Sequence, residues 1–186
     1  MNSQTSLDQL AVTNQRRELR VTLNGVLWAL QILWGFFFAG NGFGKVLLAD
    51  ADLYAQAPQS VAWFAAVPQP LIFFIGVCEL LGGLGLILPA ITRVRPRLTP
   101  LAAAGLTVTM VLATCFHLLR GEYALVPVNL VLGGVAAFIA VGRSRRRPIT
   151  AAPLTRRRAL TALAVLLVVV LTMIVPTWYS MTNAQL

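Results

Sequence analysis

Five long apolar runs, separated by short segments that hold most of the charges, constrain this chain more than any other feature. The runs cover residues 21–42, 69–90, 98–119, 124–141 and 159–176. A helix needs roughly 20 mostly apolar residues to cross a hydrocarbon core of about 30 Å. Because lipid cannot satisfy open backbone polar groups, we expect each run to form a transmembrane helix.

The composition agrees with a membrane protein. Hydrophobic residues make up 58% of the chain and charged residues 11%, with a mean hydropathy of +0.76. Soluble domains are about a quarter charged, so this chain lacks the residues that keep a surface wet. The net charge of +9 is not a nucleic-acid signal, because the basic residues lie between the apolar runs. No nucleic-acid partner is expected.

The distribution of basic residues predicts the orientation. Three segments hold nearly all of them: Arg16, Arg17 and Arg20; Arg93, Arg95 and Arg97; and Arg143, Arg145, Arg146, Arg147, Arg156, Arg157 and Arg158. The alternate segments hold only Lys45 and Arg120. The positive-inside rule then predicts a multi-pass protein of the bacterial inner membrane, with its N-terminus inside and its C-terminus outside. The first run has no convincing small-residue cleavage site of the A-x-A kind, so we expect it to be an uncleaved first helix.

Small and polar residues recur at helical spacing on one face of each of the first four runs. The faces hold Asn24, Trp28, Gln31, Gly35 and Gly42; Gly76, Glu79 and Gly83; Thr107, Met110, Thr114, His117 and Gly121; and Asn129, Gly133, Ala136 and Ala140. Such faces let membrane helices approach closely. The fold class predicted is therefore all-α, a four-helix transmembrane bundle plus a fifth, lipid-facing C-terminal transmembrane helix.

This fold divides the chain into four parts. Residues 1–20 form a cytoplasmic segment, 21–142 the bundle, 143–158 an arginine-rich cytoplasmic loop, and 159–186 the fifth helix with an external tail. Residues 60–67 are expected to form a short interfacial helix that caps the outer mouth of the bundle, with Trp63 at headgroup level. Trp178 and Tyr179 are expected to anchor the fifth helix at the same interface.

Glu79 is the outstanding candidate for a functional residue, because an ionisable group in a membrane span is costly. Burial favours the neutral acid unless a cation or several donors hold it ionised. The functional interpretation is a proton carrier, a general acid or base, or an anchor for a polar ligand. The structural alternative is a hydrogen bond between helices.

Five other residues complete the candidate site. His117 is the only histidine and could exchange a proton near neutral pH, although a lone histidine can equally be a packing residue. Gln31 is a candidate ligand contact that we expect to lie near the depth of Glu79. Lys45 lies at the outer end of the face of the first run that holds Gln31, and it is either a ligand contact or an interface anchor. Asn129 is a ligand contact or a structural hydrogen-bonding residue, and Trp28 offers an aromatic surface.

Several cofactors are not expected. A single histidine excludes bis-histidine haem, and Cys78, Cys115 and His117 do not supply the four ligands of a structural zinc site. No C-x-x-C pair is present, so the two cysteines are interpreted as packing residues. No metal site is predicted.

Four patches of the sequence carry a recognisable pattern. They are the aromatic-then-glycine stretch 36–45, the E-x-x-G-G-x-x-L-x-x-P pattern from Glu79 to Pro89, residues 98–102 leading to His117 and Arg120, and residues 128–130 with Gly142-Arg143. In these patches the chain resembles the DoxX-like family of bacterial membrane proteins. The resemblance implies a four-helix bundle with polar positions Lys45, Glu79, His117 and Asn129. It also implies relatives such as a small subunit of a thiosulfate:quinone oxidoreductase. The fifth helix and the arginine-rich loop depart from the family pattern.

Three functions remain open. The leading hypothesis is a membrane subunit of an oxidoreductase system, in which protons reach a quinone-like ligand in the outer half of the bundle. Lacking a redox cysteine pair, it would depend on the quinone or on a redox partner protein. The second is a stand-alone isomerase or cyclase that acts on a lipophilic small molecule through Glu79. The third is a non-catalytic assembly or transport factor, and any of the three could be a homo-oligomer in contact with membrane lipid.

Overall fold

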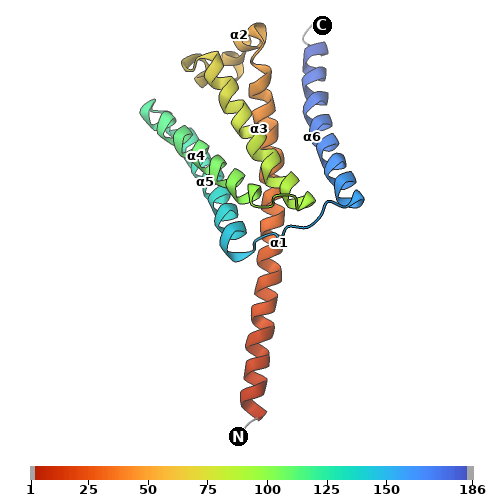
Figure 1. Cartoon of the computed structure of the whole chain (residues 1–186). Coiled ribbons are helices and arrows are strands. Elements are labelled where there is room, and N and C mark those ends of the chain that lie inside the picture. Colours follow the sequence, from red (N-terminus) through yellow and green to blue (C-terminus); the bar gives the residue numbers. More distant parts are fainter. Residues whose placement is uncertain (1–2, 184–186) are drawn as a thin grey trace.

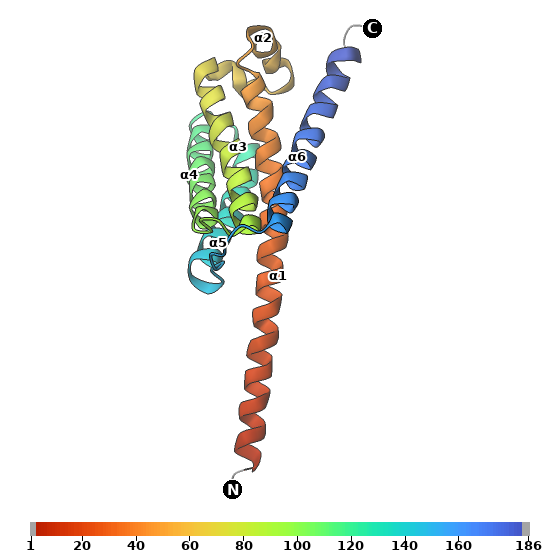
Figure 2. The ribbon, with the colours of Figure 1, turned by 45° about the vertical axis from the view of Figure 1, so that its right-hand side comes forward.

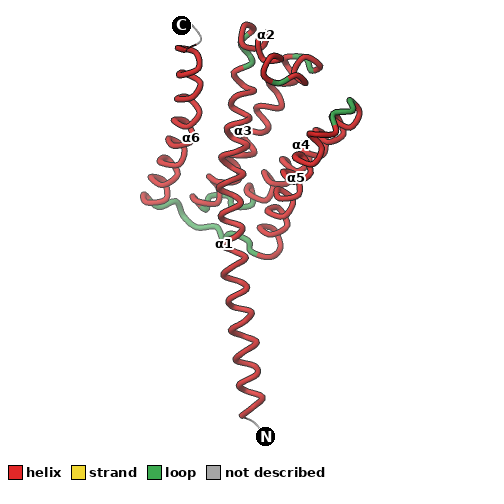
Figure 3. Tube along the Cα trace, turned by 180° about the vertical axis from the view of Figure 1, so that it is seen from behind, coloured by secondary structure: helices red, strands yellow, loops and turns green. Residues whose placement is uncertain are grey.

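The computed structural model describes the backbone of residues 3–183, and side chains for residues 12–13, 15, 18, 22–55 and 61–172. This part of the chain is helical apart from its loops (Figure 3). The long helices are α1 (Ser3–Leu47), α3 (Gln69–Thr92), α4 (Leu98–Leu119), α5 (Val126–Val141) and α6 (Arg156–Asn183). The shorter ones are α2 (Ala51–Ser60), the 3₁₀ turns η1 (Ala62–Ala66) and η2 (Tyr123–Leu125), and the π-helical turn η3 (Gly142–Arg146).

Four helices form a bundle, as predicted. α1 packs along α3, α3 along α4, and α4 along α5, whose end returns to α1. Four segments within the described residues are long and apolar enough to cross a membrane: Thr22–Leu47, Gln69–Thr92, Leu98–Leu119 and Tyr123–Arg146. The last is longer than the predicted run 124–141, because η2 and η3 extend α5 at both ends.

The first helix is much longer than its apolar run. α1 begins at Ser3, and its N-terminal half projects from the bundle as a single helix (Figures 1 and 2). Residues 3–21 contain neither proline nor glycine, so the helix of the span propagates backwards without interruption. The side chains of Arg16, Arg17 and Arg20 lie outside those that are described.

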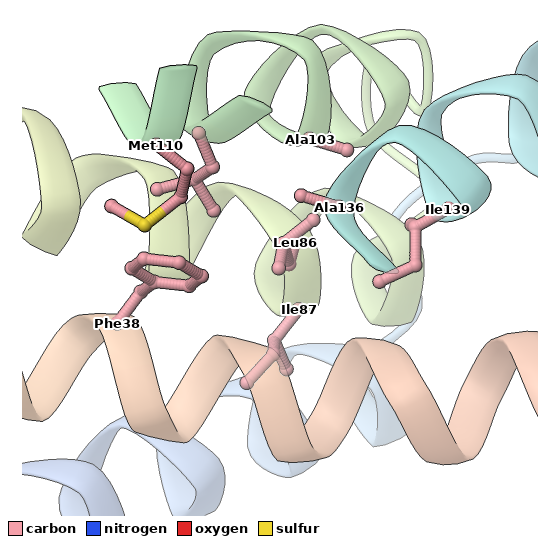
Figure 4. Close-up of a cluster of buried hydrophobic side chains, with 8 residues drawn as sticks. Phe38, Leu86, Ile87, Ala103, Met110, Ala136 and Ile139 are labelled. Carbon is pink, nitrogen blue, oxygen red and sulfur yellow. The ribbon is translucent and has the colours of Figure 1, made fainter. Parts of the chain in front are cut away.

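The core of the bundle is an apolar layer to which each of the four helices contributes. Figure 4 shows Phe38 of α1 beside Met110 of α4, and farther along the same layer Leu86 and Ile87 of α3, Ala103 of α4, and Ala136 and Ile139 of α5. All of these side chains are almost fully buried. Most of the predicted small-residue faces point inward, as the buried Gly133 and Ala136 of α5 show, but Asn24 and Gly121 at the ends of two of these faces are exposed.

Helices α1 and α3 meet along glycines spaced seven residues apart. A Cβ on Gly42 would lie 2.3 Å from the backbone nitrogen of Leu80, and one on Gly83 would lie 2.4 Å from that of Ala39. Backbone atoms cannot move aside as a flexible side chain can, so these positions require glycine. We call Gly35, Gly42, Gly76 and Gly83 the glycine seam.

The loops divide the molecule into two ends. Arg93, Arg95 and Arg97 follow α3, and the chain after η3 runs beside them, since the Ala152 amide donates to the Arg93 carbonyl at 3.3 Å. We call this the arginine end. The opposite end carries α2 and the end of α6 (Figures 1 and 2), and we call it the α2 end.

The fifth predicted run is a helix, α6, which leans away from the bundle (Figure 1). Among its described side chains, Val169 is buried and most of the leucines are exposed. An exposed apolar surface of this kind is typical of a lipid-facing helix. A fifth membrane crossing remains a prediction, and Trp178 and Tyr179 lie outside the described side chains.

Candidate functional site

A buried ion pair joins α1 and α3 in the half of the bundle that faces the α2 end. The ammonium of Lys45 donates to Oε2 of Glu79 at 2.6 Å, and the two side chains are 13% and 6% exposed. A cation beside a carboxylate favours its ionised form, whereas burial favours the neutral acid. The structure places the Lys45 ammonium directly beside the Glu79 carboxyl group.

The glycine seam positions this pair. A Cβ on Gly76 would lie 2.7 Å from Cβ of Lys45 and 2.9 Å from the carbonyl oxygen of Gly42. Gly76 lies three residues before Glu79, on the same face of α3. The absence of a side chain there lets Lys45 run along α3 and place its ammonium one turn deeper.

An aromatic cluster covers the α2 end of the bundle above the ion pair. Phe64, Val67 and Ile72 are its buried members, and Leu48, Tyr54, Val61, Trp63 and Phe116 pack against them. Ile72 lies two turns from Glu79 on the same face of α3, so the cluster and the ion pair share one buried face of that helix. The expected cap at residues 60–67 is present as the 3₁₀ turn η1, preceded by the helix α2, which the sequence did not predict.

His117 lies under the same cap and is held by a carboxylate. Its Nδ1 is 2.6 Å from Oε2 of Glu122, and its ring packs edge-to-face against Trp63 and Phe116. Nε of Arg120 donates to the other oxygen of Glu122 at 2.8 Å. The hydrogen bond from His117, aided by the Arg120 guanidinium, holds the pKa of the Glu122 carboxyl below its usual value. With Nδ1 committed to Glu122, Nε2 is the nitrogen left for a ligand.

Asn129 lies one helix away, near the start of α5, which packs along α4. Its Nδ2 is buried and has no hydrogen-bond acceptor among the described residues. A buried amide N–H without an acceptor in the protein is expected to donate to a group outside the chain, such as a ligand oxygen. The structure thus places Lys45, Glu79, His117 and Asn129 in the half toward the α2 end.

Gln31 and Trp28 lie elsewhere. Gln31 donates to the carbonyl of Leu86, which is seven residues and about 10 Å along α3 from Glu79. The expectation that Gln31 shares the depth of Glu79 is wrong, because the faces of α1 and α3 run antiparallel and Lys45 reaches Glu79 instead. Both Gln31 and Trp28 contact Arg143 at the arginine end.

Sequence reasoning missed two residues, Glu122 and Arg143. For Arg143 a signal existed: it continues the small-residue face of α5 at spacings of three and seven from Ala140 and Ala136, whereas Arg145 does not. For Glu122 the only signal in the sequence was an acidic residue five positions after the lone histidine, with a glycine just before it. In the structure this glycine, Gly121, has φ +72° and turns the chain.

The cysteines do not join the site. Cys78 and Cys115 are free, and Cys115 is exposed on α4. Among the described residues, no three histidine, cysteine, aspartate or glutamate side chains gather as a metal site would require.

These features define a helical membrane bundle with a buried ion pair and a histidine–carboxylate pair beneath an aromatic cap. The profile of the DoxX-like family matches residues 29–139, more than half of the chain, and the chain therefore belongs to that family. The matched region includes Lys45, Glu79, His117 and Asn129. No curated protein and no solved structure matched the chain.

Proposed function

We propose that this protein is the membrane subunit of an oxidoreductase system and that it exchanges protons with a quinone-like ligand beneath the aromatic cap. The observation that carries the proposal is the buried pair of Lys45 and Glu79, 2.6 Å apart in a membrane span. Ionisable groups at this depth are rare and mark ligand sites or proton relays more often than they support the fold.

The ligand class follows from the hydrogen-bonding groups. A quinone offers two carbonyl oxygens on a flat apolar ring, and the ring suits the aromatic side chains of Trp63 and Phe116. The unpartnered Nδ2 of Asn129 and the remaining N–H groups of Lys45 are donors for such oxygens. Lipid-soluble quinones reach such a site from the membrane.

The proton chemistry balances with a partner. Reduction of a quinone to a quinol consumes two electrons and two protons. The electrons come from a redox partner protein, while Glu79 with Lys45, and Nε2 of His117, each deliver a proton to one ligand oxygen. Glu122 keeps the His117 ring in place through its contact with Nδ1. The α2 end faces the outside of a bacterial inner membrane in this proposal, since the arginine end carries the basic loops.

The test is a calorimetric titration of the purified full-length protein in nanodiscs with decylubiquinone. Glu79→Gln is expected to weaken binding about 10- to 100-fold. The variant no longer holds the Lys45 ammonium in place, and the charge-assisted hydrogen bond from this ammonium to a ligand oxygen contributes roughly 1.5–3 kcal/mol. Glu18→Gln is the matched control, since Glu18 is an exposed residue on the projecting part of α1. Equal affinity in the two variants would contradict the proposal.

The other hypotheses give different results. An isomerase or cyclase would turn over a lipophilic substrate without any electron donor, and Glu79→Gln would abolish that turnover. An assembly factor would bind no quinone and would tolerate Glu79→Gln, yet it would fail when the glycine seam is disrupted.

A further inference from the structure

Arg143 is a buried cation without a carboxylate partner. It is 3% exposed, at the start of the π-helical turn that ends α5. Its Nε donates to Oε1 of Gln31, and its Nη1 donates to Oδ1 of Asn24 at 2.8 Å. None of the ion pairs in the described part of the chain involves Arg143.

The guanidinium also has a donor to spare. Nη2 is buried and has no acceptor among the described residues. The face of the guanidinium lies over the Trp28 ring, 5.1 Å from its centroid, which fixes its plane. A buried charge that is neither paired nor fully hydrogen-bonded is unfavourable, so this arrangement calls for an anion from outside the chain.

The fold holds Arg143 in this position. Gly142 faces Leu27 of α1, where a Cβ would lie 2.6 Å from a leucine methyl carbon. This close approach brings Arg143 against Asn24, Trp28 and Gln31, all on one face of α1. By contrast, Arg145 and Arg146 of the same turn are exposed. π-Helical turns occur frequently at functional sites.

The surroundings attract anions. Arg93, Arg95 and Arg97 lie at the same end, and of the acidic side chains that are described only Glu18 lies on this side of the bundle. Arg143 is close to the end of the span Tyr123–Arg146, the depth at which lipid headgroups lie. Guanidinium groups match the geometry of phosphate oxygens better than ammonium groups do.

We propose that Arg143, supported by Trp28, Gln31 and Asn24, binds an anionic phosphate group at the arginine end, with Nη2 donating to a phosphate oxygen. This site is separate from the ion pair of Lys45 and Glu79 and does not depend on the proposed function. Because Nη2 has no exposed surface, entry of the phosphate requires the groups that cover Nη2 to move aside. The phosphate belongs either to an anionic phospholipid or to a soluble phosphate.

Native mass spectrometry of the delipidated full-length protein, with phosphatidylglycerol or phosphatidylcholine added back, tests the proposal. The wild type is expected to retain phosphatidylglycerol at least tenfold better than phosphatidylcholine. Arg143→Gln should lose this preference, and Arg145→Gln should keep it. The preference of the wild type for phosphatidylglycerol is a test by itself, because it requires no variant to fold. If Arg143→Gln does not fold, Arg143→Lys and Arg145→Lys take the place of the two glutamine variants.

A thermal-unfolding series with inorganic phosphate distinguishes the two sources. Stabilisation of the wild type but not of the Arg143 variant by inorganic phosphate, without a lipid preference, would support the site and assign it to a soluble phosphate. The proposal is overturned if the wild type responds to neither probe, or if the Arg143 and Arg145 variants behave alike.

Discussion

Replacing Gly42 with alanine should separate α1 from α3 and break the hydrogen bond between Lys45 and Glu79. The new Cβ would lie 2.3 Å from the Leu80 nitrogen, whereas ordinary contacts begin at 3.4 Å, so the helices must part by about 1.1 Å there (3.4 minus 2.3). Adding that to the 2.6 Å between Lys45 and Glu79 gives about 3.7 Å, too long for a hydrogen bond when the side chains keep their conformations. Overpacking of this kind costs about 1–3 kcal/mol.

Gly44→Ala is the matched control. Gly44 is two residues away on the same helix, and a Cβ there would meet nothing within 4 Å. Since alanine favours a helix over glycine by about 0.5–1 kcal/mol, this variant should be as stable as the wild type or more so. Thermal unfolding of both variants in one detergent, followed by circular dichroism, measures the difference. Equal midpoints for the two variants would refute the glycine seam.

Three further variants test the site. Lys45→Met leaves Glu79 buried without its cation and should destabilise the protein by about 3–5 kcal/mol in chemical unfolding, while adding Glu79→Leu should restore much of the loss. Glu122→Gln removes a carboxyl whose pKa is lowered in the folded protein. Its stabilising contribution is therefore complete above the ordinary glutamate range and disappears as the pH falls below it, so wild type and variant should differ in melting midpoint at pH 7 and converge in strong acid. A constant difference across that range would argue against the contact with His117. Asn129→Leu removes a buried donor that has no acceptor and should leave the midpoint unchanged or higher, yet weaken decylubiquinone binding several-fold in the titration; unchanged binding would remove Asn129 from the ligand site.

The architecture of the bundle was predictable because each membrane helix can be recognised from its own stretch of sequence. Length and apolar content define each span, and the small-residue faces show which side packs inward. Gly42, Gly76 and Gly83 were recognisable by their spacing alone, and the structure confirms them as contact positions. The long N-terminal extension of α1 was not predicted, because polar residues without a breaker are compatible with either helix or coil.

The site was less accessible to sequence reasoning, because it depends on how the helices pair. Glu79 and Lys45 were both candidates, but their contact follows from the register of α1 against α3 rather than from either sequence pattern. Glu122 belongs to a turn whose path is set by Gly121, so its approach to His117 has no periodic signature. Arg143 was interpreted, with the neighbouring arginines, as a determinant of topology. The structure shows that Arg143 lies on the buried face of its helical turn while Arg145 and Arg146 are exposed.

Mild extraction of the wild-type protein, followed by native mass spectrometry of what stays bound, tests the proposed function most directly. The account predicts a retained quinone that is lost in Glu79→Gln and kept in Glu18→Gln. A bare protein, or one that retains a lipophile without redox chemistry, would contradict the oxidoreductase subunit and would favour an isomerase or cyclase.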